Sequence, residues 1–155
     1  MIRSLGNWAI VLILIMSSFF LGCRKQYPVA EKLLQAETVM NEHPDSALTI
    51  LKSIGQLVLH TKEHHARYAL LYSQALDKNY IDLTNDSLIN IAVDYYKNCD
   101  DVKAKFLSYF YLGRIYTNAN NLTQATLAYM EADQLVDELD DDYAAGLLYK
   151  QIGLV

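Results

Sequence analysis

The sequence predicts an all-α protein made of antiparallel helical hairpins, with about three hairpins followed by one unpaired terminal helix. Apolar residues recur at spacings of three and four in several windows, as they do on the buried face of an amphipathic helix. No stretch in the body of the chain alternates apolar and polar residues as a half-buried strand would. Similar motifs also return after 40 residues, from Tyr109-x-x-Leu-Gly to Tyr149-x-x-Ile-Gly, and a fixed step indicates a repeat.

The first 22 residues are predicted to be a signal peptide of the lipoprotein type. Residues 8–21 contain no charged side chain, and Arg3 precedes them. A helix that crosses the hydrocarbon core needs about 20 such residues, so this run is short for a permanent span and has the length of a signal-peptide apolar region. Arg24 and Lys25 follow the run, and because positive charge tends to stay on the cytoplasmic side, they disfavour a simple anchor.

A cysteine stands just after this apolar run. The sequence Leu21-Gly22-Cys23 resembles the lipobox of bacterial lipoproteins, in which the cysteine receives diacylglycerol before the signal peptide is cut. The resemblance implies that Cys23 carries lipid, with acyl chains such as palmitate, and that residues 23–29 form a tether. It also implies a protein held at the bacterial cell envelope and facing the periplasm. An uncleaved anchor in the inner membrane and an ordinary secreted protein remain the alternatives.

The composition excludes some classes of function. The 155 residues are 52% hydrophobic and 20% charged, which suits one globular domain with an ordinary core. The formal net charge is −5, whereas a nucleic-acid-binding surface needs concentrated Lys and Arg. Only two cysteines occur, so lipid on Cys23 would leave Cys99 without a partner for an intramolecular disulfide.

The helical repeat domain is predicted over 30–155. Its first hairpin, about 30–55, has one apolar stripe on each side of Pro44 and ends at Gly55, because proline and glycine interrupt helices. The second hairpin, about 65–98, has a longer polar connection between its two helices.

The third hairpin, about 104–138, is the clearest of the three. Its first helix ends before a polar turn at 118–121, and its second helix is expected over 122–139. A partial repeat over 142–155 then begins another helix. Several apolar residues of that helix have no second helix to cover them, which indicates either self-association through this end or a longer array of which the chain is a part.

The third hairpin also carries a spacing pattern that resembles the tetratricopeptide repeat. In that family a large residue precedes Leu-Gly and Tyr in the first helix, and Ala, an aromatic residue and Ala follow in the second. The matching residues are Tyr109, Leu112, Gly113, Tyr116, Ala125, Tyr129 and Ala132. We expect Gly113 and the alanines to let two backbones approach closely, while the tyrosines fill the space between hairpins. In the preceding hairpin, Ser73 stands where the family has glycine.

The chain further resembles the periplasmic lipoproteins of the Bacteroides type that contain these repeats. The resemblance implies a right-handed superhelix in which the first helix of each hairpin lines a concave groove. That groove would bind a peptide or protein partner, with no catalytic activity and no cofactor. The alternative is that the chain is the N-terminal sensory part of a longer signalling or transcriptional regulator that contains such repeats.

The candidate partner contacts are first-helix residues that lie off the predicted packing stripe: Arg67, Leu70, Gln74, Phe110, Arg114, Thr117 and Lys150. Phe110 and Arg114 stand four apart and therefore share a helix face. We expect an exposed aromatic side chain beside a cation, suited to a partner with an acidic or carbonyl group. The alternative is that Phe110 packs against a neighbouring hairpin and that Arg114 is a surface cation.

The sequence indicates no other chemistry. His60 and His64 stand four apart, yet no third ligand follows at a helical spacing, so a solvated turn is preferred to a metal site. The acidic run at 133–142 lacks the loop pattern that calcium needs. Cys99 is expected to be a small packing residue rather than a nucleophile. Because no phosphate-binding loop or Ser-centred motif occurs, we expect no enzyme. The acidic net charge leads us to expect no nucleic-acid partner.

Overall fold

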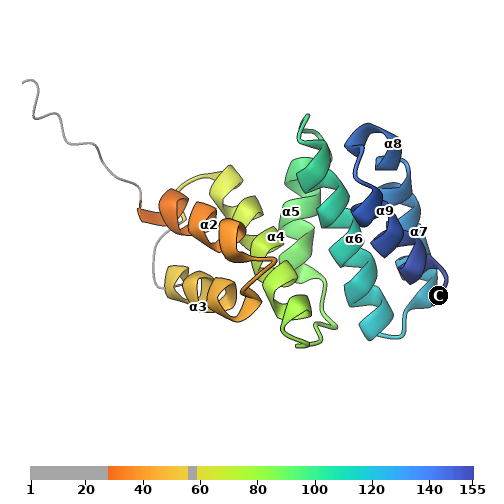
Figure 1. Cartoon of the computed structure of the whole chain (residues 1–155), viewed down its shortest axis with the longest axis horizontal. Coiled ribbons are helices and arrows are strands. Elements are labelled where there is room, and N and C mark those ends of the chain that lie inside the picture. Colours follow the sequence, from red (N-terminus) through yellow and green to blue (C-terminus); the bar gives the residue numbers. More distant parts are fainter. Residues whose placement is uncertain (1–27, 56–58) are drawn as a thin grey trace, which may run out of the picture.

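All regular elements that the structure describes are helices. The computed structural model describes residues 28–55 and 59–155, and within these ranges it contains no strand (Figure 1), so the all-α prediction is confirmed for them. The helices are α2 (Pro28–Val39), α3 (Pro44–Ile54), α4 (Lys62–Lys78), α5 (Ser87–Tyr96), α6 (Val102–Asn118), α7 (Leu122–Asp133), α8 (Val136–Leu139) and α9 (Asp142–Ile152). The predicted signal peptide, 1–22, and Cys23 lie outside the described residues.

Helices that follow one another in the sequence pack side by side. α2 lies against α3, α4 against α5 and α6 against α7, and these pairs meet through α3 with α4 and α5 with α6. α4 also contacts both α2 and α6, while α9 packs on α7. α4 and α6 therefore lie in the middle of the molecule. No helix in the described ranges is long and apolar enough to cross a bilayer.

Side-chain caps fix where four of these helices begin, because a side-chain oxygen accepts a hydrogen bond from a free N–H of the first turn. The backbone N–H groups donate to the capping side chains as follows: His64 to Thr61 (3.0 Å), Ala104 to Asp101 (2.9 Å), Gln124 to Asn121 (3.4 Å) and Ala144 to Asp141 (3.0 Å). Thr61, Asp101 and Asp141 cap α4, α6 and α9. They stand 40 residues apart, so each of these three helices begins at the same point of the sequence repeat.

One predicted helix is divided in two. The sequence predicted a single helix over 122–139, but α7 ends at Asp133 and the short α8 follows. α8 lies against α6, and Leu135 and Leu139 of this segment pack against the core. The apolar spacing of α7 continues across this turn, because Val136 and Leu139 follow the buried Tyr129 and Ala132 by seven residues each.

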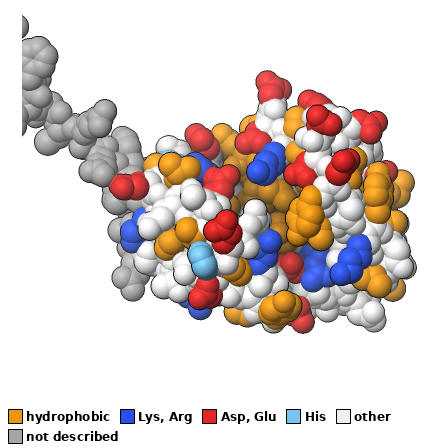
Figure 2. All heavy atoms as spheres, viewed as in Figure 1, with side chains coloured by type: hydrophobic (Ala, Val, Ile, Leu, Met, Phe, Trp, Pro, Cys, Tyr) orange, Lys and Arg blue, Asp and Glu red, His pale blue; other side chains and the backbone are white. Residues whose placement is uncertain are grey.

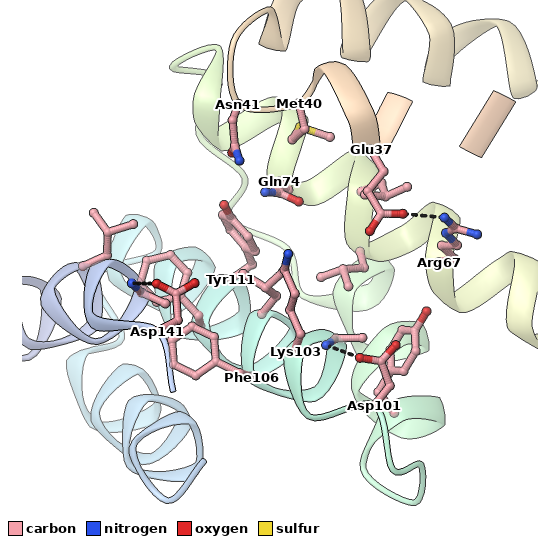
Figure 3. Close-up of a pocket in the computed structure, with 18 of the residues that line it drawn as sticks. Glu37, Met40, Asn41, Arg67, Gln74, Asp101, Lys103, Phe106, Tyr111 and Asp141 are labelled. Carbon is pink, nitrogen blue, oxygen red and sulfur yellow. Dashed lines mark hydrogen bonds and ion pairs between the residues drawn. The ribbon is translucent and has the colours of Figure 1, made fainter. Parts of the chain in front are cut away.

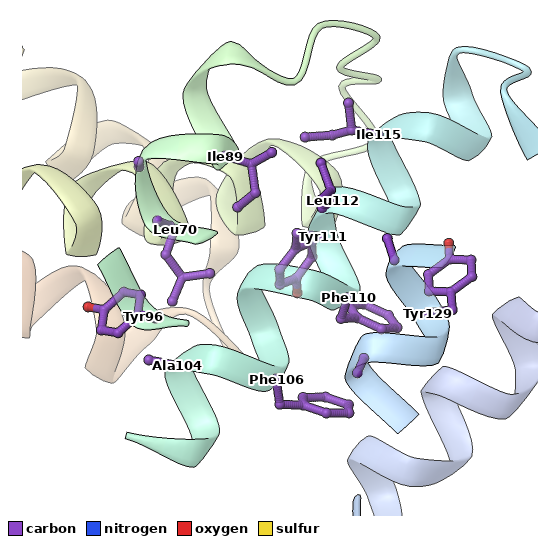
Figure 4. Close-up of a cluster of buried hydrophobic side chains, with 14 of the residues drawn as sticks. Leu70, Ile89, Tyr96, Ala104, Phe106, Phe110, Tyr111, Leu112, Ile115 and Tyr129 are labelled. Atoms are coloured by element: carbon purple, nitrogen blue, oxygen red, sulfur yellow. The ribbon is translucent and has the colours of Figure 1, made fainter. Parts of the chain in front are cut away.

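The core consists of two clusters of buried side chains that meet at α4. The larger cluster joins α4 to α5, α6, α7 and α9, and Figure 4 shows part of it. The smaller cluster joins α2 and α3 to α4. α4 supplies a different face to each, with Ala66, Ala69 and Leu70 in the larger cluster and Leu71, Ala75 and Leu76 in the smaller one.

Gly113 lies at a close approach of α6 to α7. A Cβ atom at this position would stand 2.2 Å from Tyr129 Cε1 and 2.5 Å from Tyr129 Cδ1, well inside the separation at which carbon atoms attract. The Tyr129 ring is fully buried, and its hydroxyl lies 3.1 Å from Thr117 Oγ1. The ring therefore packs on the bare backbone of Gly113 and has no free space to move into.

The other residues of the predicted packing pattern divide into two groups. Leu112, Ala125 and Ala132 are buried, whereas Tyr109 and Tyr116 are half-buried and pack at the edge of the larger cluster. The Tyr116 hydroxyl donates a hydrogen bond of 2.7 Å to Asp86 Oδ2. Because Asp86 is the residue just before α5, this bond ties α6 to the start of the preceding helix.

The final helix leaves apolar side chains in solvent, as the sequence predicted. Tyr149 is 54% exposed and Leu154, just beyond the end of α9, is 65% exposed, while Leu148 on α9 is fully buried. Leu148 packs in the larger cluster, so α9 is attached to the core by one face only.

Replacing Gly113 by alanine should lower the free energy of unfolding by about 1 to 3 kcal/mol, because the added methyl group would overlap the confined Tyr129 ring. Urea denaturation followed by circular dichroism measures this. Gly146, in the interior of α9, is the matched control, since a Cβ there would meet nothing within 4 Å. Gly146→Ala should stabilise the protein by about 0.5 to 1 kcal/mol. Equal effects at the two sites would contradict the close approach at Gly113.

Candidate partner-binding groove

A groove of about 570 Å³ lies between the side of the molecule formed by α2 and α4 and the side formed by α6 and α9. Its volume is within the range of about 300 to 1,000 Å³ that is typical of ligand-binding pockets. Figure 2 shows this hollow with a hydrophobic floor and charged side chains around its rim. The groove is therefore the candidate site for a partner.

Apolar side chains form the floor. Leu70 from α4 and Phe106 and Phe110 from α6 line the groove, and none of them is more than 6% exposed. The rings of Phe106 and Phe110 stack with their centroids 6.1 Å apart. α6 can present this surface because its lining residues recur at spacings of three and four, which places them on one helix face. An apolar side chain of a partner would be shielded from water here.

Two polar groups interrupt this apolar floor. Gln74 is only 8% exposed, and its side chain lies beside that of Tyr111, which is 5% exposed (Figure 3). Burial raises the pKa of the Tyr111 hydroxyl, the charge of Asp77 raises it further, and hydrogen bonding to Gln74 opposes the rise. Tyr111 is therefore a neutral hydroxyl at physiological pH. Together with the Gln74 amide it can exchange hydrogen bonds with a polar group of a ligand.

The charged side chains that line the groove differ in whether they have partners. Glu37 of α2 forms an ion pair with Arg67 of α4. The carboxylates of Asp101 and Asp141 accept the capping bonds of α6 and α9. The Lys103 side chain extends from α6 into the cavity (Figure 3), and it forms no ion pair with any residue that the structure describes.

Several of these groove residues were missed by the sequence reasoning, although the repeat step points to them. Residues 40 apart on α4, α6 and α9 line the groove together: Glu63, Lys103 and Tyr143, and likewise Arg67, Leu107 and Leu147. Because α4, α6 and α9 begin at caps that follow the same step, equivalent positions face the same side. Extending the candidate Arg67 by one repeat would have found Leu107.

The burial of Phe110 contradicts the expectation from the sequence. It was expected to be exposed, but it is 6% exposed and packs against Phe106, Tyr111 and Tyr129. The alternative interpretation, in which Phe110 packs against its neighbours, agrees with this. The reason is that α6 has helices on more than one side, since α4, α5 and α7 all contact it. A residue outside its tyrosine stripe can therefore still be buried.

Arg114 holds three helices together instead of standing free on the surface. Its Nε donates to Asp77 Oδ1 at 2.9 Å, its Nη2 lies 2.8 Å from the same oxygen, and its Nη1 donates to Gln151 Oε1 at 2.9 Å. Asp77 belongs to α4 and Gln151 to α9, so Arg114 of α6 links the helices on either side of it. A partner that bound Arg114 would have to compete with these bonds.

The remaining candidates lie at different places. Arg67, Leu70, Gln74 and Phe110 line the groove, whereas Arg114, Thr117 and Lys150 do not. Cys99 is half-buried, lines the groove, and donates from Sγ to Tyr95 O at 3.3 Å. In the described part of the chain, no three His, Cys, Asp or Glu side chains come together as a metal site would require.

Comparison of the chain with protein-family models, with curated proteins and with solved structures found no match.

Removing the charge at position 114 should destabilise the fold. Arg114→Met keeps much of the side-chain bulk but leaves the Asp77 carboxylate, 21% exposed, without its cation, so we expect a loss of about 1 to 3 kcal/mol in urea denaturation. Arg67→Met is the matched control, because its partner Glu37 is 48% exposed and such pairs contribute less than about 1 kcal/mol. Similar losses in both variants would argue against the linking role of Arg114.

Proposed function

We propose that this protein is a membrane-anchored, non-catalytic scaffold that binds a peptide or protein partner in the groove. The observation that supports this most directly is the groove itself: an open hollow of about 570 Å³, with an apolar floor, two polar groups within the floor and charged groups at its rim. An apolar site of this size with a few converging polar groups is a favourable place for a ligand.

The proposal includes a specific arrangement of the helices. We take them to be tetratricopeptide-type hairpins stacked as a right-handed superhelix, with α4, α6 and α9 as equivalent helices. The common 40-residue step of their caps Thr61, Asp101 and Asp141 supports this, as does the contact of Gly113 with Tyr129. In such an array the concave face is formed by equivalent helices, which agrees with the origin of the groove lining.

The membrane anchor is proposed from the sequence alone. The motif Leu21-Gly22-Cys23 supports lipid attachment to Cys23, and residues 24–27 with the start of α2 would connect the lipid to the helices. A groove tethered to a membrane meets partners on the same membrane at a high local concentration, because the tether holds the groove close to them.

A change at the rim of the groove should weaken partner binding without unfolding the protein. Tyr143 lines the groove and is 73% exposed, so Tyr143→Ala removes an aromatic contact and no core packing. Peptides selected from a random display library on the full chain in mild detergent serve as probes, and fluorescence anisotropy measures their affinity. We expect the variant to bind them about tenfold more weakly.

The matched control is Tyr149→Ala, on the same helix. Tyr149 is also exposed, at 54%, but it is not among the groove residues. Peptide affinity should stay within about twofold of the unchanged protein, because a side chain outside the interface adds little. If both tyrosine variants bound equally well, or if no peptide were selected at all, the groove would not be the binding site.

The anchor has its own test. When the full chain is expressed in a bacterium with labelled palmitate, we expect label on the protein and loss of that label in Cys23→Ala, because the thiol is the attachment point. Cys99→Ala should keep the label. Label that survives the change at Cys23 would exclude lipidation there, and it would leave the groove hypothesis untouched.

A further inference from the structure

Two uncharged polar side chains lie side by side in the apolar floor of the groove. Gln74 of α4 and Tyr111 of α6 both line the groove, although they are only 8% and 5% exposed. A buried polar group whose hydrogen bonds are not all made destabilises the state in which it stands. A ligand that supplies the missing partners is therefore favoured here over one that does not.

The pair has hydrogen-bonding capacity left for a ligand. In Figure 3 the amide nitrogen of Gln74 is turned toward the Tyr111 hydroxyl. Burial raises the pKa of that hydroxyl, whereas hydrogen bonding to Gln74 lowers it, and a donor to the phenol oxygen has this lowering effect. The Gln74 N–H is thus the donor of the pair. The Gln74 carbonyl and the Tyr111 O–H remain beside each other as an acceptor and a donor.

A primary carboxamide, the side-chain group of Asn and Gln, matches this arrangement. It has an oxygen that can accept from the Tyr111 hydroxyl and an N–H on the same side that can donate to the Gln74 carbonyl. A carboxylate has no N–H to donate, and an ammonium has no acceptor for the Tyr111 O–H. A trans peptide unit of the main chain directs its N–H and C=O to opposite sides, so it cannot meet both groups at once.

The charges of the lining do not favour a charged ligand group. The lining contains four carboxylates and three cations: Glu37, Glu63, Asp101, Asp141, Arg67, Lys78 and Lys103. Because the two signs nearly cancel, a charged group would gain little to offset its loss of water above an apolar floor. A carboxamide is polar but uncharged, so its transfer into the groove costs less free energy.

Apolar side chains stand one helical turn from the polar pair. Leu70 precedes Gln74 by four residues on α4, Leu107 precedes Tyr111 by four on α6, and all four residues line the groove. Residues four apart on a helix have Cβ atoms about 5 to 6 Å apart. In an extended peptide, side chains two residues apart share a side and lie about 7 Å apart. An apolar side chain and a carboxamide at that spacing can therefore reach both contacts together.

We propose that the groove selects a peptide segment that carries an Asn or Gln two residues from a large apolar side chain. The carboxamide accepts from the Tyr111 hydroxyl and donates to the Gln74 carbonyl, while the apolar side chain lies against Leu70 and Leu107. This inference rests on the proposed function, because it names the class of peptide that the same groove binds.

The same random-peptide selection tests this selectivity when it is repeated on variants of the polar pair. Gln74→Met and Tyr111→Phe keep the shape of each side chain and remove its hydrogen-bonding atoms. Gln124→Met and Tyr109→Phe are the matched controls, since neither residue lines the groove. Peptides selected on the unchanged chain and on the controls should be enriched in Asn or Gln two positions from a Leu, Met or Phe. Peptides selected on the two groove variants should keep the apolar residue and lose that enrichment.

Affinities of single peptides test the same contact on the unchanged chain, whether or not the variants fold. Replacing the selected Asn or Gln by the matching acid should weaken binding about tenfold or more, because the N–H is lost and an unpaired charge is buried. On Gln74→Met the same replacement should weaken binding by less than about threefold.

Two results would contradict the proposed selectivity while the groove remained a peptide site. One is a set of selected peptides without enrichment in Asn or Gln, or with an enrichment that persists in both groove variants. The other is a replacement by the acid that leaves affinity for the unchanged chain as it was. A selection that yields no peptide sensitive to Tyr143→Ala would overturn the proposed function, and the selectivity with it.

Discussion

The contact between Gly113 and the ring of Tyr129 sets the position of α6, on which the rest of the molecule depends. α6 packs on α7 through this contact, carries Arg114 toward α4 and α9, and forms much of the groove floor on another face. In the preceding pair the position 40 residues before Gly113 holds Ser73, which is also buried.

The groove forms because three helices, α4, α6 and α9, begin at residues that stand 40 apart in the sequence. Because Thr61, Asp101 and Asp141 begin α4, α6 and α9 at one step, side chains at a given repeat position face the same side. Packing then determines how they are used. A position that lies between helices holds a buried aromatic residue such as Phe110. A position that faces solvent holds an exposed residue such as Lys103 or Tyr143. One sequence period thus produces both the core and the floor and rim of the candidate site.

The period of apolar residues was sufficient to predict the helices, because it depends on the local geometry of the backbone alone. The break between α7 and α8 could not be predicted in this way, since it depends on the contact of Leu139 with a core that other helices build. The predicted exposure of Phe110 was wrong for the same reason. Phe110 lies off the tyrosine stripe, but the number of helices around α6 decides its burial. The partners of Arg114 lie 37 residues away on either side, beyond any local pattern.

The division of the core at α4 affects which helices can unfold locally. The helices α2 and α3 are held by the smaller cluster, which α4 shares with the larger one through a separate face. Within the described residues these two helices pack on the rest of the molecule mainly through α4, and regions with few packed contacts open locally at a low free energy. α2 and α3 can therefore unfold locally at a lower free energy than the centre, as one cooperative unit. Because Glu37 and Met40 belong to that unit, one wall of the groove can open while the floor stays folded.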